Sequence, residues 1–235
     1  MNTAPSESDR EPDERPMLIR AEMLSAEPTH GARIDFERNM RVLPWLSVGL
    51  VAACATVFAL QIALGALRDQ QAIVRAGALV RDRVVQGEVW RFLSAIFLHA
   101  SPGHLIGNCI VLYVVGMACE HAFGIARTAA IYFLGGLGGG LLSVALHGGP
   151  SVGASGAIFA VMGATIVFFY RHHRAVHLRD KRVGFVLLAW ALYQIGLGFF
   201  SPLIDNFAHV GGLLAGGAIA LLLRPTLLPE ASDPQ

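Results

Sequence analysis

The sequence predicts an all-α membrane protein, built as a bundle of six transmembrane helices. Of its 235 residues, 54% are hydrophobic and only 15% are charged, whereas a soluble domain carries about a quarter charged residues. The charges crowd the N-terminal segment and two connecting segments, 68–91 and 171–182. The runs between them are long enough to cross a bilayer, which takes roughly 20 apolar residues.

The chain divides into a tail, a membrane domain and a second short tail. Residues 1–41 are rich in Pro, Glu, Asp and Arg and have no sustained periodicity, so we expect a disordered cytoplasmic tail. No signal peptide is expected, because no apolar stretch with a small-residue cleavage site follows a basic start. The membrane domain is expected over residues 42–223, and residues 224–235 form the C-terminal tail.

Breaks in the apolar runs place the six helices. The Ser101-Pro102-Gly103 cluster is a helix-break signal before the second helix, and Pro150 suits the start of the fourth, since proline is tolerated in a first helical turn. The helices are expected over 42–67, about 102–120, about 124–146, about 151–170, 183–200 and 206–223. A polar loop is expected between the first two helices.

The arginine distribution predicts that both termini lie in the cytoplasm. With six spans the termini share one side, which also receives the basic connector between the fourth and fifth helices. The arginines of the 68–91 loop are discordant, and we expect that loop to lie along the membrane surface. Arginine far outnumbers lysine, and Lys181 is the only lysine. This composition suggests a bacterial cytoplasmic membrane.

Several classes of function are disfavoured. Cys54, Cys109 and Cys119 lie in apolar runs without a CxxC pair, so we interpret them as packing residues. There is no HExxH motif, and no basic patch interleaved with aromatics that would suggest nucleic-acid binding. A transporter is disfavoured because no carboxylate lies deep in a span and no inverted repeat is visible.

The functional hypothesis starts from Ser155, in Gly153-Ala154-Ser155-Gly156, within a run free of charged residues. Polar side chains at membrane depth are costly and usually face the bundle or a water-filled cavity. If the fourth helix begins near Ser151, Ser155 lies about one turn inside, close to the positive end of the helix. The alternative for this motif is a small-residue contact between helices.

A serine nucleophile needs a base, and histidine is the residue that remains once Lys181 is placed in a connector. His209 lies in the sixth helix, and Gly212 and Gly216 share its face. These glycines would let that helix approach the fourth closely. The alternative is a buried histidine bonded to a carbonyl. Asp205 could orient His209, but we expect it at the membrane edge and predict a dyad, not a triad.

His104 and Asn108 are four residues apart and therefore share a helix face. Both can donate hydrogen bonds, so with the Ser155 N–H group they could line an oxyanion hole. The alternative is helix–helix hydrogen bonding. We expect His99 and Gln194 to be structural hydrogen-bonding residues. A metal site formed by His99, His104 and His209 matches no familiar zinc spacing, so no metal is predicted.

Taken together, these residues resemble the rhomboid family of intramembrane serine proteases, from about Leu43 to Leu223. The matching residues are Trp90-Arg91, His99, His104 with Asn108, Glu120, Gly153-Ala154-Ser155-Gly156, and Ala208-His209-Val210-Gly211-Gly212 with Gly216. Phe159 departs from the tyrosine that some members have. Its ring can still pack under His209, but it lacks the phenol hydrogen bond.

The resemblance implies a rhomboid-type six-helix bundle with a water-filled cavity open to the extracytoplasmic side. Ser155 would attack a peptide bond of a transmembrane substrate, and His209 would take its proton and pass it to the leaving amine. His104, Asn108 and the Ser155 N–H would hold the oxyanion. The loop after the first helix would be partly embedded.

No cofactor is implied, and the expected partners are transmembrane protein substrates and membrane lipids, not nucleic acid. Because fold alone does not fix function, the alternative is a non-catalytic rhomboid-like protein that binds membrane clients.

Overall fold

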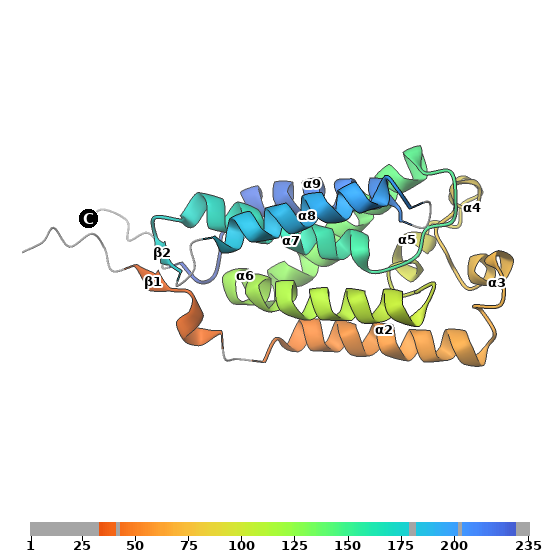
Figure 1. Cartoon of the computed structure of the whole chain (residues 1–235), viewed down its shortest axis with the longest axis horizontal. Coiled ribbons are helices and arrows are strands. Elements are labelled where there is room, and N and C mark those ends of the chain that lie inside the picture. The colour runs from red at the N-terminus through yellow and green to blue at the C-terminus, as the bar shows by residue number, and fades with distance from the viewer. Residues whose placement is uncertain (1–32, 41–42, 179–181, 202–203, 229–235) are drawn as a thin grey trace, which may run out of the picture. The chain divides into compact units, whose positions relative to one another are not determined.

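The computed structural model describes residues 33–40, 43–178, 182–201 and 204–228 (Figure 1). The predicted tail residues 1–32 and 229–235 lie outside the described residues. The elements are β1 (Ile34–Asp35), η2 (Glu37–Asn39), α2 (Trp45–Ala63), α3 (Gln70–Arg75), α4 (Arg81–Val85), α5 (Arg91–Ser94), α6 (Pro102–Leu146), α7 (Ser155–His172), β2 (Val176–His177), α8 (Val183–Gly198) and α9 (Asn206–Leu222).

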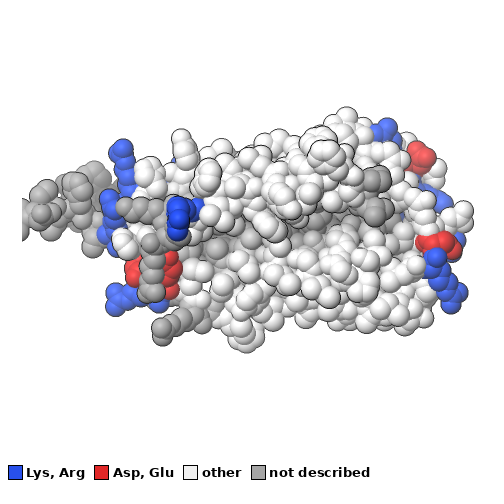
Figure 2. Space-filling view, viewed as in Figure 1, with Lys and Arg blue, Asp and Glu red and all other residues white. Residues whose placement is uncertain are grey.

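Three helices of the described part, α2, α6 and α7, are long and apolar enough to cross a membrane. The 45-residue α6 consists of two helices, because Gly124 interrupts it with φ of 76° and ψ of 166°. The apolar helices α8 and α9 are shorter, at 16 and 17 residues. Each of the six predicted helices therefore has a helical counterpart. On the face drawn in Figure 2, the charged residues gather at the two ends and leave an uncharged band between them.

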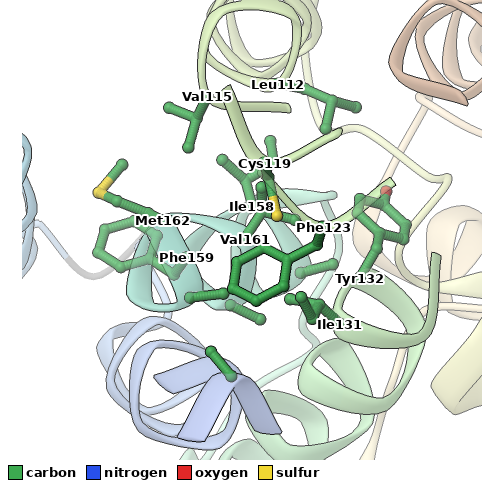
Figure 3. Packing of buried hydrophobic residues seen from close by; sticks show 14 of the residues in the cluster. Leu112, Val115, Cys119, Phe123, Ile131, Tyr132, Ile158, Phe159, Val161 and Met162 are labelled. Atoms are coloured by element: carbon green, nitrogen blue, oxygen red, sulfur yellow. The ribbon is translucent and has the colours of Figure 1, made fainter. Parts of the chain in front are cut away.

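The helix α7 lies at the centre of the bundle, packed against both α6 and α9. Its buried side chains, among them Val161 and Met162, meet apolar residues of α6 such as Leu112 and Phe123 (Figure 3). A Cβ atom at Gly212 of α9 would collide with the backbone of Gly156 in α7. The predicted close approach of the last helix through its glycine face is confirmed.

A partly buried carboxylate ties α2 to α6. The side chain of Glu120 accepts hydrogen bonds from the backbone N–H groups of Leu46 (3.2 Å) and Ser47 (2.7 Å), and from the Ser47 hydroxyl (2.5 Å). These N–H groups belong to the first turn of α2, which has no side-chain cap of its own and leaves its amides without intrahelical partners. Glu120 therefore caps a neighbouring helix.

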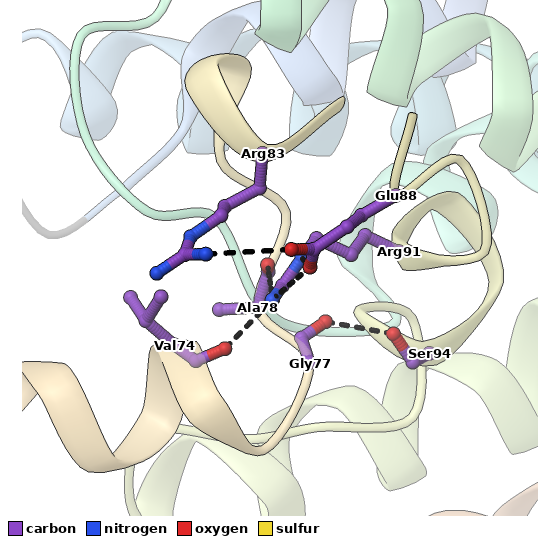
Figure 4. A network of polar contacts seen from close by, with 7 residues as sticks. All are labelled: Val74, Gly77, Ala78, Arg83, Glu88, Arg91 and Ser94. Carbon is purple, nitrogen blue, oxygen red and sulfur yellow. Dashed lines mark hydrogen bonds and ion pairs between the residues drawn. The ribbon is translucent and has the colours of Figure 1, made fainter. Parts of the chain in front are cut away.

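The loop predicted between the first two helices contains three short helices, α3, α4 and α5. At its centre is the Arg91 guanidinium, which donates to Glu88 (2.7 Å) and to the carbonyls of Val74 (2.7 Å) and Ala78 (2.8 Å) (Figure 4). Arg81 binds carbonyls at the C-terminal end of α6. These two arginines, which are discordant with the predicted orientation, therefore hold the loop together and to the bundle.

The segment just before α2 differs from the predicted disordered tail. The strand β1 pairs in parallel with β2, with Ile34 opposite Val176. Phe36 is only 2% exposed, and its ring packs on those of Phe168 and Phe169 in α7. The prediction missed Phe36 because residues 1–41 are mostly polar. The burial of its ring holds the neighbouring residues against the bundle.

Candidate active site

The connection into α7 sets the position of Ser155. Ser151 pairs with Leu79 in an antiparallel bridge with two 2.9 Å hydrogen bonds, so it cannot begin a helix. Gly153 follows with φ of 125°, a conformation that favours glycine. The helix begins at Ser155, which corrects the expectation that it begins near Ser151 with the serine one turn inside. The Ser155 amide is therefore among the N–H groups of the first turn, which have no intrahelical partner.

Ser155 and His209 lie within hydrogen-bond distance. The Oγ atom of Ser155 is 2.9 Å from Nε2 of His209, although the two residues are 54 positions apart. The imidazole stacks on the ring of Phe159, with centroids 4.3 Å apart and planes 4° from parallel. Its Nδ1 atom is buried and has no hydrogen-bond partner among the described residues. The ring is thus oriented by Ser155 and Phe159.

Asp205 is engaged elsewhere. One of its oxygens accepts the backbone N–H of Ala208 at 3.0 Å and so caps α9. The other accepts the hydroxyl of Ser143, near the end of α6. In the described part of the chain, the serine–histidine pair therefore has no carboxylate hydrogen-bonded to the histidine.

His104 and Asn108 lie beside the serine, next to Gly153. An ideal Cβ atom at Gly153 would be 2.8 Å from Nε2 of His104 and 3.4 Å from Nδ2 of Asn108. Glycine therefore keeps this space open. The Nδ2 group of Asn108 is buried and has no partner among the described residues. An unpaired buried donor costs about 1–3 kcal/mol, which an anionic oxygen bound here would recover.

These four residues line one cavity of about 1600 Å³. Most of its wall is apolar or glycine, and α8 contributes Trp190 and Gln194. The described residues contain no cluster of His, Cys, Asp and Glu suited to a metal ion. The cavity can therefore admit an extended peptide segment to a hydroxyl, an imidazole and two side-chain donors.

The remaining polar residues are placed as follows. The N–H group of His99 donates to the Gln61 side chain at 3.0 Å, and its carbonyl accepts from the Gln61 amide at 3.2 Å, which agrees with a structural role. Sequence reasoning missed Gln61, and it also missed Ser143 and His147 near Asp205. Nothing in the sequence marks these three, because their partners are distant along the chain.

Comparison with known proteins gives a consistent result. A family model of the Rhomboid domain matches residues 86–226. Rhomboid protease GluP of Bacillus subtilis is 35% identical over 167 residues, which cover 71% of this chain and 32% of GluP. RHOMBOID-like protein 5 of Arabidopsis thaliana is 39% identical over 156 residues, which cover 64% of this chain and 50% of that protein. The chain therefore spans a third to a half of the length of these two relatives.

Rhomboid protease AarA of Providencia stuartii is 28% identical over 214 residues, which cover 80% of this chain and 76% of AarA. This match extends over most of both proteins.

Proposed function

Because the chain belongs to the rhomboid family, we propose that it is an intramembrane serine endopeptidase that cleaves transmembrane helices of other proteins. The observation that carries this proposal is the 2.9 Å contact between Ser155 and His209, inside a cavity of an apolar helical bundle. The relatives named as proteases support the same class of activity.

In the first chemical step, the Ser155 hydroxyl attacks the carbonyl carbon of the scissile peptide bond. Its proton passes to Nε2 of His209, which acts as the general base. Phe159, stacked on the imidazole, holds the ring in the plane needed for this transfer. Such stacking takes the place of the carboxylate that orients histidine in a triad.

The negative charge that develops on the substrate oxygen falls among preorganised donors. These are the N–H group of Ser155 at the start of α7, the unpaired Nδ2 group of Asn108 and the ring N–H of His104. Each oxyanion donor is worth about 10²–10³-fold in kcat. Because Gly153 has no Cβ atom, this position stays free.

The second half of the reaction uses the same groups. Nε2 of His209 gives its proton to the leaving amine, which releases one product and leaves an acyl ester on Ser155. Water in the cavity, deprotonated by His209, then hydrolyses the ester. No cofactor enters these steps.

The chain is a multi-pass membrane protein, and we place it with six spans and both termini in the cytoplasm of a bacterial cell. Transmembrane substrates and lipids are its proposed partners. The apolar outer surfaces of the helices, including exposed Phe185 and Leu214, support contact with lipid.

Cleavage of a transmembrane reporter by the purified protein in liposomes tests the proposal. We expect cleavage by the wild type and none by Ser155→Ala, with both proteins binding the reporter. A wild type that binds the reporter without cleaving it would instead indicate a non-catalytic client-binding protein. Equal cleavage by Ser155→Ala would exclude Ser155 as the nucleophile.

A further inference from the structure

Asp205 holds a fixed position that the serine–histidine pair does not explain. Its side chain is 11% exposed, and it stands at the N-cap of α9, four residues before His209. Both of its oxygens are occupied, one by the N–H group of Ala208 and the other by the hydroxyl of Ser143. The carboxylate is therefore held between the end of α6 and the start of the helix that carries His209.

The charge of this residue is isolated within the cavity. Among the described residues that line the cavity, Asp205 is the only carboxylate, and no Lys or Arg lines it. The other titratable groups there are His104 of α6, His147 at the C-cap of α6, and His209 itself; α7 and α8 supply none. Nδ1 of His147 is 4.0 Å from the Asp205 carboxylate. Within the described lining, Asp205 is therefore the one source of fixed negative charge.

His209 needs such a charge during the reaction. When Nε2 takes the proton of Ser155, the imidazole becomes a cation whose Nδ1–H group is buried and has no acceptor among the described residues. Asp205 is the N-cap of α9, one turn before His209, and both residues line the same cavity. A negative charge near the imidazole favours its protonated form.

We propose that Asp205 is a positioning residue for the Ser155–His209 pair. It fixes the start of α9 against α6 through Ser143, and it balances the positive charge that His209 acquires without bonding to it. This inference rests on the proposed protease function.

The test uses full-length protein in liposomes and a transmembrane peptide reporter, with kcat and KM measured over a range of pH. Asp205→Asn is the main variant, because asparagine also caps helices well and can bond to Ser143, but it carries no charge. Asp205→Ser is a second uncharged cap. Ser143→Ala is the matched control, since it removes the tie between α6 and α9 and leaves the charge in place.

We expect Asp205→Asn to lower kcat about tenfold at an unchanged KM. The acid limb of its pH profile should move to lower pH, because His209 is harder to protonate without the nearby negative charge. In Ser143→Ala that limb should stay in place. If Asp205 had a purely structural role, its substitution would lower the rate by the same factor at every pH and would not shift the acid limb.

An Asp205→Asn profile with the wild-type acid limb would overturn the proposal. So would failure of both uncharged variants to fold, because Asp205 would then be a structural cap alone. The wild type serves as the internal reference: if it does not cleave the reporter, the protease function itself fails. Active wild type with an unshifted Asp205→Asn profile refutes only the role of Asp205.

Discussion

Replacing Gly212 by alanine tests whether the close contact between α7 and α9 sets the geometry of the active site. The new Cβ atom would lie 2.9 Å from the carbonyl carbon of Gly156, and it would also overlap the carbonyl oxygen. Carbon atoms normally approach to about 3.5–4.0 Å. The added Cβ atom is attached directly to the α9 backbone, and the atoms it meets belong to the α7 backbone. No side-chain rotation can relieve the overlap, so the two helices must separate by roughly 1 Å.

That displacement acts directly on the serine–histidine contact, since α7 begins with Ser155 and α9 carries His209. A misplacement of about 1 Å costs about 10²-fold in rate, so we expect kcat to fall by about that factor. Overpacking costs about 1–3 kcal/mol of stability, partly offset by up to about 1 kcal/mol from the better helix propensity of alanine.

The assay is reporter cleavage in liposomes, together with thermal unfolding in detergent. Gly217→Ala is the matched control in the same helix, because its Cβ atom would make ordinary contacts, 3.5 Å from Val167 and 3.8 Å from Gly163. We expect this control to cleave at nearly the wild-type rate. Wild-type turnover in Gly212→Ala, or an equal loss in Gly217→Ala, would refute the reasoning.

Three further substitutions test other contacts. Glu120→Ala should lower the free energy of unfolding by about 2–4 kcal/mol, because amides of the first turn of α2 lose a charged acceptor; unchanged thermal unfolding would show that the cap is dispensable. Phe36→Ala should destabilise the protein by about 3–5 kcal/mol, measured beside Phe185→Ala at a site 73% exposed; equal melting temperatures would contradict its anchoring role. Gly153→Ala should reduce turnover by about 10²-fold, because alanine disfavours φ of 125° and its Cβ atom would lie 2.7 Å from a histidine ring. Gly103→Ala, with no atom within 4 Å of the added Cβ, is its control, and equal rates in the two would contradict this account.

Helix order was predictable because each apolar run is bounded by charged or helix-breaking residues. In such runs a polar side chain is costly, so few candidates remained, and Ser155 and His209 stood out among them. The glycines that follow His209 then indicated which helix it faces. Their spacing of three and seven residues after His209 places them on its face of the helix. The close approach of Gly212 to the backbone of Gly156 confirms that this face meets α7.

The features that sequence reasoning missed depend on contacts between distant segments. The start of α7 is set by the bridge between Leu79 and Ser151, and no local signal reports that pairing. The hydroxyl that binds Asp205 comes from Ser143, 62 residues away. Likewise, β1 is stabilised by β2, which lies beyond α7. Local composition carries no information about such partners.

Labelling with a fluorophosphonate probe tests the central claim most directly, because the probe reacts only with an activated serine. The wild type, Ser155→Ala and His209→Ala would be labelled in detergent, and the modified residue would be located by peptide mass spectrometry. We predict labelling of the wild type at Ser155, and none in either variant. Equal labelling of Ser155→Ala, or a label on another serine of the wild type, would contradict the assignment of Ser155 and His209 as the reactive pair.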